Sequence, residues 1–134
     1  MKKIEHIGIA VHNLEEAIVT YEDLLKTKCY KIEEVKSEGV KTAFFMVGDS
    51  KIELLEATNP DSPIAKFIEK RGVGMHHIAF DVDDINAEIN RLLKEGYNLI
   101  QHTPKEGADN KLIAFLHPKS THGVLVELCQ ERVD

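Results

Sequence analysis

The stretch "HIGIAVHNLEEAIVTYEDLL" (residues 6–25) decides the fold, because the chain contains a second copy of it. The stretch "HIAFDVDDINAEINRLLKEG" (residues 77–96) aligns with it at a constant offset and without gaps. In each copy an alternating apolar run predicts a strand, and apolar residues at helical spacing then predict an amphipathic helix. Asn13 and Asp84 align with each other between these two elements, and both residue types suit a helix N-cap. Each copy therefore predicts a strand, a cap and a helix.

Three strand-like runs follow each predicted helix. In the first half they are residues 29–35, 40–48 and 51–57, and in the second half they are residues 97–101, 111–117 and 123–130. The segment between the halves contains two prolines and a short helix-like piece that ends at glycines. The sequence thus predicts an α+β fold with two βαβββ modules in pseudo-twofold repeat. We expect a single domain, 1–134, made of module 1–58, linker 59–75 and module 76–134.

The composition bounds the class of protein. A chain of 134 residues with 43% hydrophobic residues is long enough to bury one core, and its formal net charge of -6 argues against nucleic-acid binding. No apolar run has the length of a membrane-spanning helix, and residues 1–11 lead into a strand rather than a signal peptide. Cys29 and Cys129 are too far apart in sequence to indicate a zinc ribbon, and we expect both to be small core residues. These features favour a soluble, cytoplasmic protein with neither a nucleic-acid nor a membrane partner.

Two histidines align in the repeat, on the strand face that carries small residues. His6 shares its face with a glycine and an alanine, and His77 shares its face with an alanine, while the apolar residues lie opposite. Small neighbours leave the open space that a ligand pocket needs. His76 lies on the face opposite to His77, so we expect it to have a structural or supporting role.

The last strand of each half carries one glutamate in a matching place, Glu53 and Glu127. A carboxylate within an apolar strand is costly unless it is paired or bound to a metal. With His6 and His77, the two glutamates form an N2O2 set that suits zinc, nickel, cobalt, manganese or iron, and spacing alone does not choose between them. The alternative is that the histidines are satisfied strand residues and the glutamates lie at exposed edges.

The paired modules with "HIGIAV" (residues 6–11) and "HHIAFDV" (residues 76–82) resemble the vicinal-oxygen-chelate, or glyoxalase-like, superfamily. Three longer stretches resemble its methylmalonyl-CoA epimerase family: "HIGIAVHNLEEA", "DSPIAKFIEKRGVGMHHIAFDV" and "FLHPKSTHGVLVEL". The resemblance extends over nearly the whole chain. It implies a cup-shaped open sheet around a metal site, usually within a homodimer.

The resemblance also implies the ligands and the reaction. It identifies His6, Glu53, His77 and Glu127 as ligands of one divalent metal ion, which is Co, Zn, Ni, Mn or Mg. The substrate it implies is an acyl-CoA thioester, methylmalonyl-CoA, whose two C2 epimers interconvert through a metal-stabilised enolate. Epimerisation needs proton removal from one face and delivery to the other, so we expect Glu127 and Glu53 to be catalytic.

Two further residues are candidates for substrate contacts. Lys119 is suited to a phosphate or carboxylate, although an ordinary solvated turn lysine has the same pattern. Thr42 occupies the place where some relatives of the family carry a glutamate. Threonine cannot act as that base, which leaves the second acid/base group unassigned, with metal-bound water or Glu53 as candidates.

Two other functions on the same scaffold compete with an epimerase. Glyoxalase I, which is lactoylglutathione lyase, uses similar enolate chemistry, and some members carry a His/Glu/His/Glu ligand set. Residues 115–128 lack the D-P-[DN]-G turn that is common in that branch. A metal-free small-molecule-binding or resistance protein is the other alternative, but such relatives typically lose the ligand residues. Metal content after purification without chelator separates this alternative from both enzymes.

Overall fold

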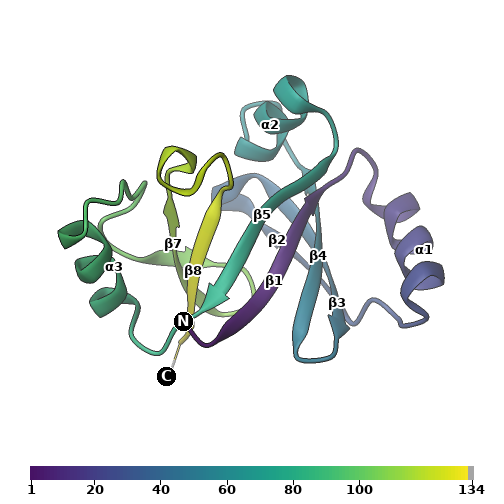
Figure 1. Cartoon of the computed structure of the whole chain (residues 1–134). Helices are drawn as coiled ribbons and strands as arrows, with labels where there is room; N and C mark the ends of the chain where they lie inside the picture. The colour runs from purple at the N-terminus through teal and green to yellow at the C-terminus, as the bar shows by residue number, and fades with distance from the viewer. Residues whose placement is uncertain (133–134) are drawn as a thin grey trace. The chain divides into compact units, whose positions relative to one another are not determined.

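The chain runs twice through the same order of elements in a computed structural model that describes residues 1–132 (Figure 1). The first half contains β1 (Lys3–Ala10), α1 (Leu14–Leu25), β2 (Lys31–Val35), β3 (Val40–Val47) and β4 (Ser50–Ala57). The second half contains β5 (Gly74–Asp81), α3 (Ile85–Lys94), β6 (Lys105–Gly107), β7 (Lys111–Leu116) and β8 (Val126–Glu131). Helix α2 (Pro63–Arg71) lies between them in sequence, and short 3-10 turns cover Lys36–Glu38 and Pro118–Thr121. The predicted α+β class and the two βαβββ halves are confirmed.

Two compact units divide the chain, and both have the same strand topology. The first unit is residues 6–76, and the second is residues 1–5 together with the chain from His77 onward. In the first unit the strand order is β2-β3-β4-β1, with β1 parallel to β4 and the other pairs antiparallel. In the second unit the order is β5-β8-β7-β6, with β5 parallel to β8 and the other pairs antiparallel. Equal topology is the result expected from the sequence repeat.

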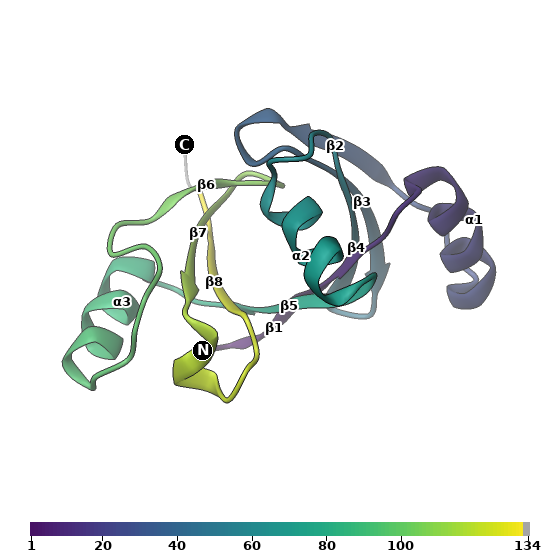
Figure 2. The ribbon, with the colours of Figure 1, turned by 90° about the horizontal axis from the view of Figure 1, so that it is seen from above.

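Helices α1 and α2 cover opposite faces of the sheet in the first unit, as Figure 2 shows. Helix α1 begins after Asn13, whose side chain accepts a hydrogen bond from the Glu16 N–H at 3.0 Å, and this confirms the predicted cap. The core beneath α1 consists of Leu14, Ala43, Phe45 and Leu54. Helix α2 instead buries Ile64 against Ala10, Val40 and Leu55. Ala10 shares its face with His6 by strand alternation, so α2 covers one end of the face that carries the predicted ligands.

Helix α3 packs on one face of the sheet in the second unit. It begins after Asp84, whose side chain accepts from the Ala87 N–H at 3.1 Å. Its buried residues contact an apolar cluster from three strands and the loops beside them, which includes Val82, Leu99, Leu116, Val126 and Leu128. Because side chains alternate along a strand, His77 and Glu127 lie on the other face of this sheet. Neither α3 nor any other helix within residues 1–132 has the length and apolar character to cross a membrane.

Ile89→Ala is expected to lower the free energy of unfolding by about 2–5 kcal/mol, since truncating a buried isoleucine removes apolar contacts and leaves a cavity. Ile89 is only 1% exposed in the core beneath α3. The matched control is Asn90→Ala, an exposed position on the same helix, which should stay within about 0.5 kcal/mol of the wild type. Urea denaturation followed by circular dichroism measures both. Equal effects would mean that the buried face of α3 is assigned wrongly.

The predicted strand at residues 97–101 is wrong. Leu99 forms only an isolated bridge with Leu116, and β6 lies further along the chain. The Ile100 N–H donates to the Phe115 carbonyl at 2.7 Å, but the Phe115 N–H donates to the side-chain oxygen of Gln101, also at 2.7 Å. Because a side-chain amide takes the place of the backbone acceptor, the ladder ends there.

Candidate metal centre

His6 and Glu53 form a buried pair in the first unit. His6 lies on β1, and Glu53 lies on the parallel strand β4, opposite Gly8. The distance from Nδ1 of His6 to Oε2 of Glu53 is 3.1 Å, and the two side chains are only 6% and 7% exposed. Gly8 brings no side chain to the space beside them. The first half therefore brings its two predicted ligands together.

His77 and Glu127 form the equivalent pair in the second unit. His77 lies on β5, and Glu127 lies on the parallel strand β8, opposite Ala79. The distance from Nε2 of His77 to Oε1 of Glu127 is 3.0 Å, and both side chains are 6% exposed. A small residue thus lies opposite the glutamate in both units, as the alternation of the sequence predicts. Within each unit the predicted histidine meets the predicted glutamate.

A phenylalanine lies opposite each glutamate on the next strand. Phe44 of β3 is the partner of Glu53, and Phe115 of β7 is the partner of Glu127. The ring of His77 meets Phe115 edge-on, with centroids 5.7 Å apart and an interplanar angle of 84°. Neither phenylalanine stands out by residue type, so sequence reasoning missed them. The two phenylalanines are separated by 71 residues, as the two histidines are. This equal spacing is the sequence signal that could have identified the phenylalanines.

Burial makes a polar partner necessary for both glutamates. An ionised carboxylate removed from water costs several kcal/mol unless it accepts hydrogen bonds or meets a positive charge. In each unit an imidazole nitrogen lies within hydrogen-bonding distance of the carboxylate. Imidazole nitrogen and carboxylate oxygen are also a common donor set for zinc, nickel, cobalt, manganese and iron. The two buried pairs are therefore consistent with a divalent metal site whose metal the donors do not identify.

The two adjacent histidines of β5 have different surroundings. The ring of His76 packs edge-on against Phe67 of α2, with centroids 4.8 Å apart and an interplanar angle of 83°. His77 is buried beside Glu127. This difference follows from strand alternation, which points adjacent side chains to opposite faces. A packing contact with α2 is the kind of structural role expected for His76.

Thr42 and Lys119 lie in contrasting environments. Thr42 is buried on β3, where it lies between Leu55 of β4 and Glu33 of β2 in the strand register. Lys119 is exposed in the second 3-10 turn, and its backbone N–H donates to Nδ1 of His117 at 3.1 Å. Their roles in substrate binding stay predictions.

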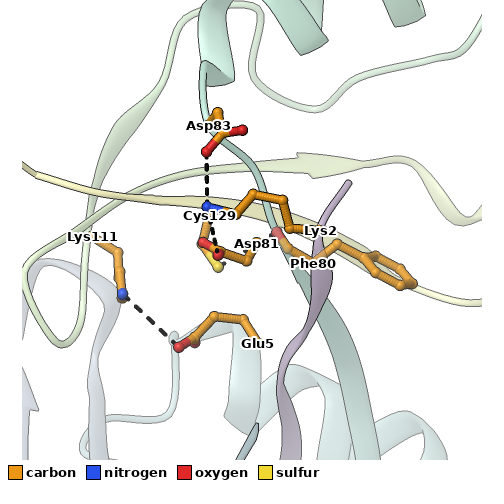
Figure 3. Close-up of polar contacts among 7 residues, drawn as sticks. All are labelled: Lys2, Glu5, Phe80, Asp81, Asp83, Lys111 and Cys129. Carbon is orange, nitrogen blue, oxygen red and sulfur yellow. Dashed lines mark hydrogen bonds and ion pairs between the residues drawn. The ribbon is translucent and has the colours of Figure 1, made fainter. Parts of the chain in front are cut away.

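A second buried polar cluster, formed by Glu5, Lys111 and Cys129, lies in the second unit (Figure 3). Nζ of Lys111 is 3.9 Å from Oε2 of Glu5, and the two side chains are 12% and 6% exposed. Cys129 is fully buried, and its Sγ donates to the Phe80 carbonyl at 3.6 Å. Burial, with a smaller contribution from the nearby carboxylate of Glu127, raises the pKa of the Cys129 thiol far above its usual range. This buried thiol has the environment expected for a small core residue.

Known proteins resemble this chain over nearly its whole length. Residues 5–115 match the family described as the Glyoxalase/Bleomycin resistance protein/Dioxygenase superfamily. Uncharacterized protein YqjC of Bacillus subtilis is 41% identical, covering 100% of this chain and 96% of that protein. The mitochondrial methylmalonyl-CoA epimerase of Dictyostelium discoideum is 41% identical, covering 94% of this chain and 76% of that protein. A Streptomyces coelicolor methylmalonyl-CoA epimerase variant in complex with 2-nitronate-propionyl-CoA has a TM-score of 0.93 and 34% identity, covering 99% of this chain and 96% of that one.

Proposed function

This chain belongs to the glyoxalase/bleomycin resistance protein/dioxygenase superfamily, and from that premise we propose that it is a metal-dependent epimerase of methylmalonyl-CoA. The support from relatives is of two kinds. The Dictyostelium protein carries the name of that activity at 41% identity. The Streptomyces epimerase, solved with an acyl-CoA compound, has closely similar coordinates.

The structural observation that carries the metal-dependent part of the proposal is the buried histidine–glutamate pair that recurs in both units, while the relatives favour the epimerase among metal-dependent enzymes. The pairs have distances of 3.1 Å and 3.0 Å and occupy matching register positions on parallel strands. Two such pairs provide two imidazole nitrogens and two carboxylates, which are suitable donors for a divalent cation. We propose that one ion of Co, Zn, Ni, Mn or Mg is held by His6, Glu53, His77 and Glu127. When bound, the ion supplies a Lewis acid that stabilises negative charge on the thioester oxygen.

Proton transfer at C2 is assigned to glutamates of the chain. The thioester makes the C2 proton acidic, and the carboxylate of Glu127 is the proposed acceptor. The C2–H bond breaks, an O–H bond forms on the carboxylate, and the electron pair moves into the enolate. Return of a proton to the opposite face of C2 gives the other epimer. Glu53 can provide that proton only if its bond to the metal is loose.

The remaining parts of the proposal concern binding. Thr42 lies on the face of the first unit that carries the His6–Glu53 pair, and on that ground we propose that it contributes to the binding of the acyl group. Lys119 is exposed, so it is suited to an anionic group of the CoA moiety. We also expect the chain to form a homodimer, which analytical ultracentrifugation measures.

Paired substrate assays test the proposed function. The metal-loaded protein should convert one epimer of methylmalonyl-CoA into the other. A coupling enzyme that consumes only the product epimer measures this conversion. It should leave the glutathione hemithioacetal of methylglyoxal unchanged. The absorbance of the thioester that a glyoxalase I would form measures this second reaction. Turnover of the hemithioacetal alone would identify a glyoxalase I instead. A protein that contains no divalent metal after purification, and that does not bind added metal, would be a metal-free binding protein instead.

A further inference from the structure

The metal site proposed above, on which this inference rests, needs each imidazole to be held in one orientation. The His77 side chain is 6% exposed, and its Nε2 lies 3.0 Å from Oε1 of Glu127. The torsion that turns an imidazole about its bond to Cβ has broad, roughly two-fold preferences. The side chain of His77 therefore does not fix its own ring plane, and a neighbouring group has to do so.

The ring of Phe115 is a neighbour of this kind. Its centroid lies 5.7 Å from that of the His77 ring, and the two planes meet at 84°. This edge-to-face arrangement is one that aromatic rings favour, because the positive edge of one ring meets the negative face of the other. His77, Glu127 and Phe115 all belong to the second unit, so the contact lies within one compact unit.

The strand register puts these three side chains on one face of the sheet. Phe115 of β7 is the direct partner of Glu127 on β8, and Glu127 is the direct partner of Ala79 on β5. Residues directly opposite each other on neighbouring strands point to the same face. Ala79 lies two residues after His77 and therefore shares its face. The contact between the two rings thus follows from the pairing of three strands.

The backbone of Phe115 brings its side chain especially close to Glu127. The Phe115 N–H donates to Oε1 of Gln101, and its carbonyl accepts from the Ile100 N–H, both at 2.7 Å. In an antiparallel ladder both backbone groups of a residue point to the same side, so those of Phe115 point away from β8. Phe115 and Glu127 are therefore a non-hydrogen-bonded pair, whose Cα atoms are about 4.5 Å apart rather than about 5.5 Å.

Phe115 is itself held in place, as a residue that orients another one has to be. Its backbone is fixed on one side by the two hydrogen bonds to residues 100 and 101. Its side chain packs against a buried cluster of Ala79, Ile113 and Cys129, of which Ala79 and Cys129 are fully buried. The ring therefore forms a fixed surface against which the His77 imidazole rests.

We propose that Phe115 is a positioning residue of the metal site. Its ring holds the plane of the His77 imidazole, so that Nε2 stays directed toward the Glu127 carboxylate. Phe115 provides no donor atom and acts only through His77. Because the imidazole is oriented before an ion arrives, less of the free energy of metal binding is lost in ordering the ring.

Phe115→Leu tests the proposal, with Phe80→Leu as the matched control. Phe80 lies on β5 of the same unit, but it packs on the cluster beneath α3, on the opposite face of the sheet. Phe115→Leu should weaken the affinity for Co²⁺ by about tenfold, because the variant keeps apolar bulk but loses the ring. The visible absorption of the bound cobalt should change as well, since it reports the geometry of the ligands. Phe80→Leu should leave both at wild-type values, and Phe115→Tyr, which keeps a ring, should restore both.

Titration of gel-filtered protein with Co²⁺ against a chelator of known affinity measures these differences, and circular dichroism confirms the fold. Phe115→Met replaces Phe115→Leu if the leucine variant does not fold. Wild-type affinity and spectrum in the variant without the ring would overturn the positioning role and leave the proposed function intact. Equal weakening by Phe80→Leu, or no recovery in Phe115→Tyr, would overturn it too, because lost packing would then be the cause.

The wild-type protein separates this inference from the proposed function. A wild type that binds no Co²⁺ would overturn the metal site and the positioning role together. A wild type that binds Co²⁺, with the expected pattern among the variants but without epimerisation of methylmalonyl-CoA, would overturn the proposed function and support the role of Phe115.

Discussion

The His77→Ala variant is expected to contain far less than one divalent metal ion per chain after purification and to lose epimerase activity. The His76→Ala variant should keep metal binding and activity, both at reduced levels. His77 is buried, with Nε2 3.0 Å from the Glu127 carboxylate. His76 contacts Phe67 of α2 through its ring. Loss of a residue that orients a metal ligand typically weakens metal affinity by about 10- to 100-fold, so the loss at His76 should be no larger than this, and micromolar metal in the buffer largely compensates it. Loss of one of four ligands removes a bond to the ion itself.

Metal analysis of gel-filtered protein, with circular dichroism to confirm the fold, measures this difference. The His6→Ala variant serves as the second test, because His6 is the repeat equivalent of His77 and should behave like it. Equal metal loss in His76→Ala and His77→Ala would contradict the strand register, since a slip of one residue exchanges the two faces.

Glu127→Gln is expected to lower epimerisation by about 100- to 10,000-fold, the range typical of a removed acid/base group. The amide keeps the shape of the side chain but cannot take up the C2 proton. Glu127 also belongs to the ligand set, so some metal loss should accompany the change. Measuring the rate at saturating metal separates the two effects, because added metal restores occupancy but does not restore a base.

Glu131→Gln is the matched control on the same strand. Glu131 is exposed at the end of β8, and its substitution should leave both metal content and turnover at wild-type values. A Glu127→Gln protein with full metal and full activity would assign proton removal at C2 to a different residue.

Much of the fold was predictable because the sequence repeat carries it. The copies that begin at His6 and His77 predicted two strands and two helices, and the structure confirms these elements and both caps. Alternation also predicted that the histidine and the glutamate of each half share a face. Local pattern therefore sufficed wherever a residue's environment depends on its own strand and helix.

The parts that the sequence did not predict depend on pairing between distant strands. Residues 97–101 have the composition of a strand, but the Gln101 side chain takes the hydrogen bond that would have continued the ladder at Phe115. The buried pair of Glu5 and Lys111 joins residues far apart in the chain, and no periodicity signals it. The contact between the rings of Phe115 and His77 likewise requires the pairing of β7 with β8.

The most direct test of the central claim is the entry of solvent deuterium at C2 of methylmalonyl-CoA. Metal-loaded wild-type protein is incubated with one epimer in heavy water, and the C2 proton is followed by nuclear magnetic resonance. The proposed mechanism predicts exchange together with appearance of the other epimer, both abolished by a chelator and restored by divalent metal. Retention of the C2 proton by the metal-loaded protein would contradict the assignment.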